Sequence, residues 1–131
     1  QDSLDRILAR GELLVVSRNS PTTFYQDKSG PTGFEFALAG LLADELGVTL
    51  NMTPAFSLGG IFERLRRGDA DLAAAGLTLT ERRAARYPHT APYDSLVTQI
   101  VYRAGKRRPR GIGDLSGSYC TAYAKAPPIW R

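Results

Sequence analysis

Residues 13–17 read Leu-Leu-Val-Val-Ser, and this short apolar run is the part of the sequence from which the fold can be predicted. A run of strand length without polar alternation is typical of a strand that is buried on both faces of a parallel sheet. Segments with helical spacing lie before and after it, and further segments of strand length follow. We therefore expect residues 13–17 to form the central strand of a sheet.

The segments around this strand alternate between helix and strand patterns. Three have the apolar spacing of helices, and each is followed by a glycine that can end a helix: Leu4–Arg10, Phe34–Leu46 and Leu58–Arg67. Three have the composition of strands: Thr49–Thr53, Leu72–Ala75 and Leu96–Tyr102. Such alternation indicates βαβ units with right-handed crossovers, so the predicted fold class is α/β with a mostly parallel sheet.

Two segments add detail to this prediction. Residues 26–33 are rich in turn formers and are expected to make a turn or a small hairpin. In Phe34–Leu46 the large apolar residues form one helical stripe, as in a helix that packs against a core. The stripe consists of Phe34, Leu38, Leu41, Leu42 and Leu46.

Composition excludes several classes of protein. The 131 residues suffice for one domain, and 43% hydrophobic with 23% charged residues is typical of a soluble globular protein. No apolar run reaches the roughly 18 residues of a membrane span or resembles a signal-peptide core, although an exported protein would look the same after its signal was removed. The single Cys120 and single His89 exclude an internal disulfide and a cysteine-rich zinc site, so no metal or cofactor is predicted.

The net charge of +4 raises the question of an anionic partner. Much of the excess lies in residues 106–110, a basic cluster around a proline, which we interpret as a solvated connector. Aromatic residues are not interleaved with these charges, as single-strand binding would require, so nucleic acid is not predicted as a partner.

The predicted binding site is a corner within residues 71–93. There a strand ends at Gly76, hydroxyls follow at Thr78 and Thr80, and a helical turn begins close to Arg83. Free N–H groups and the positive end of a helix suit an anion, and an arginine fork can hold a carboxylate by two parallel bonds. The loop at residues 18–25 leaves the carboxyl end of the central strand, where ligands bind in open α/β sheets, and should face this corner.

Other roles for these residues stay open. Arg83 could cap carbonyl groups or pair with Glu81 or Asp71, and Thr78 could cap a helix or turn. Phe24 could belong to the core or to the rim of a pocket. Glu35 opens a predicted helix, where an acidic residue is favourable, so a capping role is expected for it.

Five motifs in this order resemble the first lobe of family 3 bacterial extracellular solute-binding proteins: LVVS at 14–17, GFEFALA at 33–39, LGV at 46–48, GDADL at 68–72 and AGLTLTERR at 75–83. A narrower set resembles the amino-terminal module of the membrane-bound lytic transglycosylase F family: SRNSP at 17–21, GFEF at 33–36, QIVYR at 99–103, RPR at 108–110 and DL at 114–115. In that family a solute-binding module precedes a peptidoglycan-cleaving domain and is thought to sense cell-wall peptides.

The resemblance implies a three-layer sandwich, one lobe of a periplasmic-binding-protein-like clamshell, in the periplasm or cell envelope. It also implies that Arg83 grips a ligand carboxylate, that Thr78 donates to it, and that the Gly76 carbonyl accepts from a ligand amine. Phe24 matches an aromatic residue that lines the pocket, and the loop residue Asn19 is a further candidate contact. Amino-acid-binding members often carry an aspartate just after the first strand, where this sequence has Arg18 and Asn19, which favours a peptide or acylated ligand.

The same resemblance divides the chain. Residues 1–115 correspond to the first lobe, and residues 116–131 do not match the expected start of a second lobe, so we expect a poorly ordered tail there. A fragment of one lobe should bind its ligand weakly. A missing or fused catalytic domain is a possible partner, and the oligomeric state is not predicted.

The predicted function is therefore recognition of a small carboxylate-bearing solute and not catalysis. The only histidine has no motif that would pair it with a nucleophilic serine, and no glutamate lies in the context that a lytic transglycosylase domain would show. The alternative from another class is a non-catalytic docking domain that contacts a partner protein or anionic polymer through its basic segments.

Overall fold

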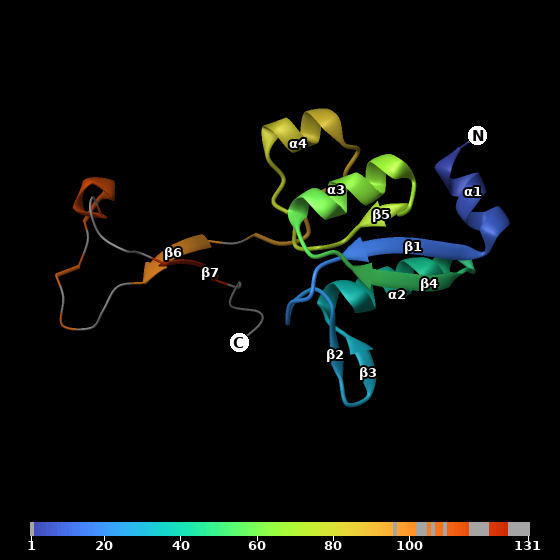
Figure 1. Cartoon of the computed structure of the whole chain (residues 1–131), viewed down its shortest axis with the longest axis horizontal. Helices are drawn as coiled ribbons and strands as arrows, with labels where there is room; N and C mark the ends of the chain where they lie inside the picture. The colour runs from blue at the N-terminus through green and yellow to red at the C-terminus, as the bar shows by residue number, and fades with distance from the viewer. Residues whose placement is uncertain are drawn as a thin grey trace. The chain divides into compact units, whose positions relative to one another are not determined.

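The computed structural model of the chain describes residues 2–95, 97–101, 105, 107–108, 110–115 and 121–125 (Figure 1). It separates into two compact units, Gln1–Thr78 and Leu79–Arg131. The first unit contains the sheet and its helices, and the second contains a short helix and an antiparallel strand pair.

The sheet of the first unit is parallel and has β1 at its centre. Strand β1 (Glu12–Ser17) lies between β4 (Thr49–Pro54) and β5 (Leu72–Ala73). Val15 pairs with Met52 on one side and with Leu72 on the other. The prediction of a central strand at residues 13–17 within a parallel sheet is confirmed.

Helices cover both faces of this sheet, which gives three layers. Figure 1 shows α2 (Phe34–Leu46) on one side of the strands and α3 (Leu58–Arg67) on the other. Leu13 and Val15 pack into a core with residues of α2 and of α1 (Ser3–Arg10), while Val16 packs with Ile61 of α3. The apolar run of β1 is buried on both faces because its alternate side chains serve two different cores.

The predicted orientation of α2 is wrong, although its bounds are confirmed. The face of α2 that packs into the protein carries Glu35, Ala39 and Ala43, each at most 4% exposed. Leu38 of the predicted stripe is 40% exposed and Leu41 is 67% exposed. Alanines at four-residue spacing let the helix backbone approach the sheet closely, and the bulkier leucines are displaced to the flanks.

A small antiparallel hairpin follows the loop after β1, as predicted for residues 26–33. It consists of β2 (Tyr25–Asp27) and β3 (Gly30–Thr32), with Gln26 paired to Pro31. The hairpin leads directly into α2 through Gly33, so it connects the carboxyl end of β1 to the helix beneath the sheet.

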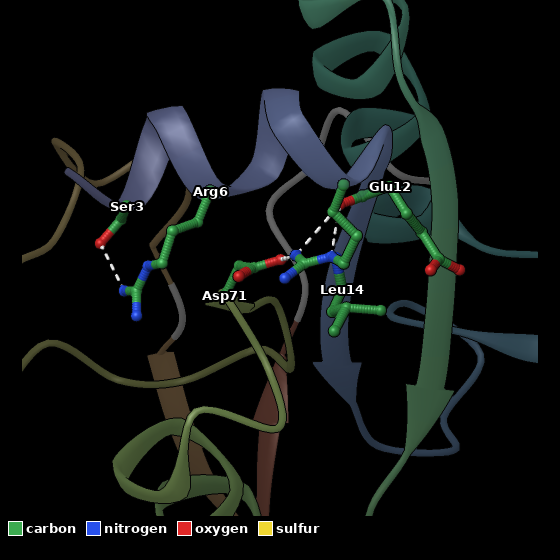
Figure 2. Close-up of polar contacts among 6 residues, drawn as sticks. Ser3, Arg6, Glu12, Leu14 and Asp71 are labelled. Atoms are coloured by element: carbon green, nitrogen blue, oxygen red, sulfur yellow. Dashed lines mark hydrogen bonds and ion pairs between the residues drawn. The ribbon is translucent and has the colours of Figure 1, made fainter. Parts of the chain in front are cut away.

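The other end of β1 is held by a cluster of polar contacts around Asp71 (Figure 2). The Asp71 carboxylate accepts a hydrogen bond from the Leu14 backbone N–H at 2.9 Å and forms an ion pair with Arg10. Arg10 also donates to the Glu12 carbonyl through Nε at 3.2 Å and Nη2 at 3.0 Å. This cluster joins the end of α1, the start of β1 and the residue before β5.

The second unit contains α4 (Glu81–Arg86), the strand β6 (Val97–Val101), the short 3-10 helix η1 (Ile112–Leu115) and the strand β7 (Thr121–Lys125). Strands β6 and β7 are antiparallel, with Gln99 opposite Tyr123. The predicted strand at 96–102 and the single helical turn before Leu115 are confirmed within the described residues; Leu96 and Tyr102 lie outside them.

The tail differs from its prediction where it is described. The sequence indicated no regular element after Leu115, yet Thr121–Lys125 forms β7. Its strand conformation follows from pairing with β6, a contact between residues 20 to 28 positions apart that local periodicity does not reveal. Residues 116–120 and 126–131 lie outside the described part of the chain, and the predicted boundary after Leu115 stays a prediction.

Within the described ranges, no helix combines the length and apolar character that crossing a bilayer requires.

Candidate functional site

The candidate site lies at the carboxyl end of β1, where the chain leaves the sheet in a tight loop. The last strand residue, Ser17, is fully buried, and Arg18 and Asn19 that follow it are exposed. The buried Thr23 closes the loop by donating its hydroxyl to the Arg18 carbonyl at 2.6 Å. The loop therefore presents the side chains of residues 18 and 19 from a backbone that is held by hydrogen bonds.

Backbone contacts join the start of this loop to its end at Phe24. The Ser20 N–H donates to the Phe24 carbonyl at 3.0 Å, and Asn19 forms a bridge with Phe24. The Phe24 side chain is 5% exposed and packs against Phe36, with ring centroids 5.9 Å apart. The sequence left two places open for Phe24, the core or the rim of a pocket. In this structure Phe24 belongs to the core.

Gly76 lies three residues after β5 and meets this loop, as the sequence predicted, although the strand expected at Leu72–Ala75 ends at Ala73. Its carbonyl oxygen accepts a hydrogen bond from Arg18 Nη2 at 3.2 Å. Its N–H points toward the Glu35 carboxylate, whose two oxygens lie 3.0 and 2.8 Å away. Gly76 has φ +61°, and a Cβ there would lie 3.3 Å from the Thr23 side chain, so glycine suits both the backbone and the space.

Glu35 connects the site to α2. Its carboxylate is buried and binds the Gly76 N–H, which differs from the predicted role of capping its own helix. The backbone around it is tightly packed: the Phe36 N–H donates to the Thr23 carbonyl at 3.0 Å. A Cβ at Gly33, where φ is +129°, would lie only 2.4 Å from that same oxygen. Close approach of α2 to the loop therefore depends on glycine at position 33.

The remaining two predicted site residues lie further along the chain. Thr78 is exposed and is the last residue of the first unit. Arg83 belongs to the second unit, where it is half-buried on α4. The capping residue of α4 is Thr80, whose hydroxyl oxygen accepts from the Arg83 N–H at 3.2 Å. The capping role considered for Thr78 is therefore performed by its neighbour two positions on.

Sequence reasoning brought Gly76 and the loop at residues 18–25 together correctly but missed how they are joined. Arg18 was noted only as a departure from the family pattern, and Glu35 only as a helix-opening acid. One signal was available for each. Arg18 directly follows a buried strand at its ligand-binding end, and Glu35 is the single charged residue in the first ten positions of an otherwise apolar helix.

Arg18 changes what the Gly76 carbonyl can bind. A ligand ammonium that used this carbonyl would share it with Arg18 and lie roughly 5 Å from the guanidinium, given ordinary hydrogen-bond lengths. Two like charges at that separation repel by about 1–3 kcal/mol for an effective dielectric between that of water and 20. An ammonium group at the Gly76 carbonyl would therefore be repelled by Arg18.

The described residues contain no group of three histidine, cysteine or acidic side chains that could hold a metal ion. His89 is exposed, and its Nδ1 lies 2.9 Å from the Thr90 carbonyl oxygen.

The fold and the site define one class of protein, an α/β lobe of a periplasmic binding protein. Residues 13–121 match the family of bacterial extracellular solute-binding proteins, family 3, and the chain belongs to that family.

Two relatives illustrate the similarity in sequence. Membrane-bound lytic murein transglycosylase F 1 of Alkalilimnicola ehrlichii is 50% identical over 112 residues, which cover 86% of this chain and 23% of the relative. Membrane-bound lytic murein transglycosylase F of Yersinia enterocolitica is 42% identical over 126 residues, which cover 96% of this chain and 26% of the relative. The chain thus spans about a quarter of the length of these relatives.

Solved structures give the same result for the fold. A mutant of ArgBP from T. maritima has a TM-score of 0.77 at 31% identity, covering 88% of this chain and 52% of that protein. An ancestral cationic amino acid solute-binding protein has a TM-score of 0.68 at 33% identity, covering 82% of this chain and 48% of that protein. This chain spans about half the length of each of these two proteins.

Proposed function

We propose that this chain recognises a small carboxylate-bearing solute, a cell-wall peptide or an amino-acid derivative, in the bacterial cell envelope. The observation that carries the proposal is the convergence of the Arg18–Phe24 loop and Gly76 at the carboxyl end of a parallel sheet, the edge where open α/β folds bind ligands. Membership of a solute-binding family and relatives named murein transglycosylases support it.

In this proposal Arg83 clasps the ligand carboxylate through its guanidinium fork, and Thr78 adds a hydroxyl and an N–H. These two roles rest on the sequence motif that they share with the family. Gly76 and Asn19 contribute from the edge of the sheet, and the buried Phe24 supports the loop that carries Asn19. The repulsion that Arg18 exerts at the Gly76 carbonyl favours a ligand whose amine is acylated, as in a peptide, over a free amino acid.

The chain itself is proposed to be non-catalytic and periplasmic. Its relatives are named as membrane-bound lytic transglycosylases, and the chain spans only about a quarter of them. Cleavage of peptidoglycan would then belong to a separate domain, fused or associated, for which this module reports the presence of a cell-wall fragment.

An amide-shift NMR titration of the chain tests the proposal, with a muropeptide and, separately, with a mixture of free amino acids. We expect the muropeptide to shift resonances of residues 19–24 and 76–83. One charge-assisted arginine pair contributes about 1.5–3 kcal/mol, whereas millimolar affinity needs roughly 4 kcal/mol, so the dissociation constant should be millimolar or weaker.

Arg83→Ala should remove these shifts, and Arg82→Ala, which deletes the same charge from an exposed neighbour, should preserve them. Two results would contradict the proposal: no shifts with either solute, or shifts that survive in Arg83→Ala. Binding to an anionic polymer instead, with a steep loss of affinity on added salt and no dependence on Arg83, would favour the docking alternative.

A further inference from the structure

The two units of the chain carry opposite net charges. The first unit, Gln1–Thr78, contains seven Lys or Arg and ten Asp or Glu, a net charge of −3. The second unit, Leu79–Arg131, contains ten Lys or Arg and three Asp or Glu, a net charge of +7. The excess positive charge of the chain therefore belongs to the second unit, and an asymmetry of this kind indicates an anionic partner for that unit.

The charge of the second unit is most concentrated between β6 and η1. Residues 106–110 read Lys-Arg-Arg-Pro-Arg, which is four cations in five positions. Five consecutive residues span at most about 14 Å, close to the Debye length of about 10 Å at 0.1 M salt, so these cations act on a partner together. The sequence pattern alone predicts a solvated connector, which leaves open what the charges contact.

The described arginines of this segment are not neutralised by acidic side chains. Arg107, Arg108 and Arg110 are exposed, and none of them belongs to an ion pair within the described residues. Asp114 is the single acidic residue among residues 95–131. Its carboxylate accepts a hydrogen bond from the Arg110 main-chain N–H at 2.8 Å. That contact joins the end of the segment to η1 through the main chain, and the guanidinium groups stay exposed.

Exposed arginines of the first unit are paired differently. Arg66 and Arg67 are neighbours at the end of α3, but Arg66 pairs with Glu63 and Arg67 pairs with Asp69. All ion pairs between described residues lie in the first unit. An anionic partner therefore gains more from the 106–110 segment than from α3, where the local charge is already balanced.

The surface of an anionic lipid bilayer is the partner that fits such a segment. Lipid headgroups can move to meet each cation, so no shaped pocket is required of the protein, and the arginine fork matches the geometry of a phosphate. Clusters of about four or more Lys and Arg are the pattern by which proteins bind anionic lipids. Single-stranded nucleic acid fits less well because no aromatic residue is interleaved with these charges.

We propose that residues 106–110 bind the anionic headgroups of a lipid surface. The attraction is electrostatic and holds the chain at that surface. It is a second interaction, separate from recognition of a solute, and it does not depend on the proposed function.

Co-sedimentation of the whole chain with vesicles tests the proposal. Vesicles of phosphatidylcholine with about 30% phosphatidylglycerol are compared with vesicles of phosphatidylcholine alone, at about 0.1 M salt. We expect the chain to bind only the anionic vesicles. Raising the salt to about 1 M shortens the Debye length to about 3 Å and should release the bound chain.

The double variant Arg107→Gln/Arg108→Gln should weaken binding to the anionic vesicles by about tenfold or more, as expected for the loss of two cations at such a surface. Arg66→Gln/Arg67→Gln is the matched control, because it removes two adjacent exposed arginines and the same net charge from ion-paired positions. The control should weaken binding by less than about twofold.

Three outcomes would overturn the proposal. The unaltered chain would fail to bind anionic vesicles, or the two double variants would lose the same affinity, since binding would then follow net charge and not this segment. The third is equal binding to soluble poly-glutamate at the same concentration of anionic groups, which would show a general polyanion site.

The muropeptide titration keeps this inference apart from the proposed function. Muropeptide-induced shifts at residues 19–24 and 76–83 should be the same in Arg107→Gln/Arg108→Gln as in the unaltered chain. Loss of vesicle binding with these shifts intact would support two separate interactions. Loss of both in this variant would overturn their separation.

Discussion

At each end of β1 an arginine and an acidic residue contact the chain next to β5, but the two clusters are built differently. At the start of β1, Arg10 pairs with Asp71 and donates twice to the Glu12 carbonyl, so its guanidinium is occupied by the protein. At the other end, Arg18 makes one hydrogen bond within the described residues, to Gly76, and the acidic residue Glu35 binds the Gly76 N–H.

The difference lies in how much of each guanidinium is bound by the described residues. Arg10 is bound to a carboxylate that also accepts from the Leu14 N–H, which joins α1, β1 and β5. Arg18 follows the carboxyl end of the same strand, and its side chain is exposed. Open α/β sheets bind ligands at the carboxyl ends of their strands, and Arg18 follows that end of β1.

The largest expected effect comes from removing the acid of the structural cluster. Asp71→Ala leaves the Leu14 N–H and the Arg10 guanidinium without their acceptor, and charged hydrogen bonds are worth about 1.5–3 kcal/mol each. We expect the free energy of unfolding to fall by about 3 kcal/mol, measured by urea denaturation. Asp69→Ala, at a more exposed ion pair with Arg67, should cost less than about 0.5 kcal/mol. Equal effects of the two substitutions would show that the Asp71 cluster is not structural.

Removing the acid at the other end should have a smaller effect on stability and a separate effect on binding. Glu35→Ala leaves the Gly76 N–H without its carboxylate, at a cost of about 1–3 kcal/mol, and frees the Gly76 peptide to move. We expect a fall of about 2 kcal/mol in the free energy of unfolding, together with loss of the muropeptide-induced shifts at residues 76–83. Glu35→Gln keeps an acceptor at this position and should retain most of the stability. A loss of stability with unchanged binding would contradict a link between Glu35 and the site.

The smallest expected loss of stability is that of Arg18→Gln, which is best compared directly with the loss in Arg10→Gln. Arg10→Gln removes an ion pair and two hydrogen bonds and should lower the free energy of unfolding by about 1–2 kcal/mol. Arg18→Gln removes one exposed hydrogen bond and should lower it by less than about 0.5 kcal/mol. Both values come from urea denaturation under the same conditions. If Arg18→Gln proved as costly as Arg10→Gln, the guanidinium at the site would be structural after all.

The helix α2 shows where sequence reasoning succeeded and failed within one element. Its bounds, Phe34–Leu46, follow from local signals, since Gly33 and Gly47 flank a run of good helix formers. The buried face of α2 does not follow from local signals. A periodic stripe of leucines predicts contact with a core, and the structure instead buries Glu35, Ala39 and Ala43. Which face of a helix is buried depends on how closely the helix must approach its sheet, and that distance is a tertiary property.

At the candidate site, too, some contacts could be predicted from the sequence and others could not. That the loop after β1 would meet Gly76 could be predicted, because the carboxyl ends of neighbouring parallel strands lie at one edge. That Glu35 would bind the Gly76 N–H, forty-one positions away in the chain, could not be predicted, because no local pattern encodes that distance. The roles of Arg83 and Thr78 stay predictions from the family motif.

The sequence by itself determined the α/β class, the central position of residues 13–17, the bounds of α2 and α3, and the family to which the chain belongs. These depend on local periodicity, on glycine stops and on short motifs, all of which act within a few residues. Only the tertiary structure decided which face of α2 is buried, which arginine is saturated and that β7 pairs with β6. Each of those depends on groups that are distant in the chain and meet only after folding, where packing and hydrogen-bond geometry select one arrangement.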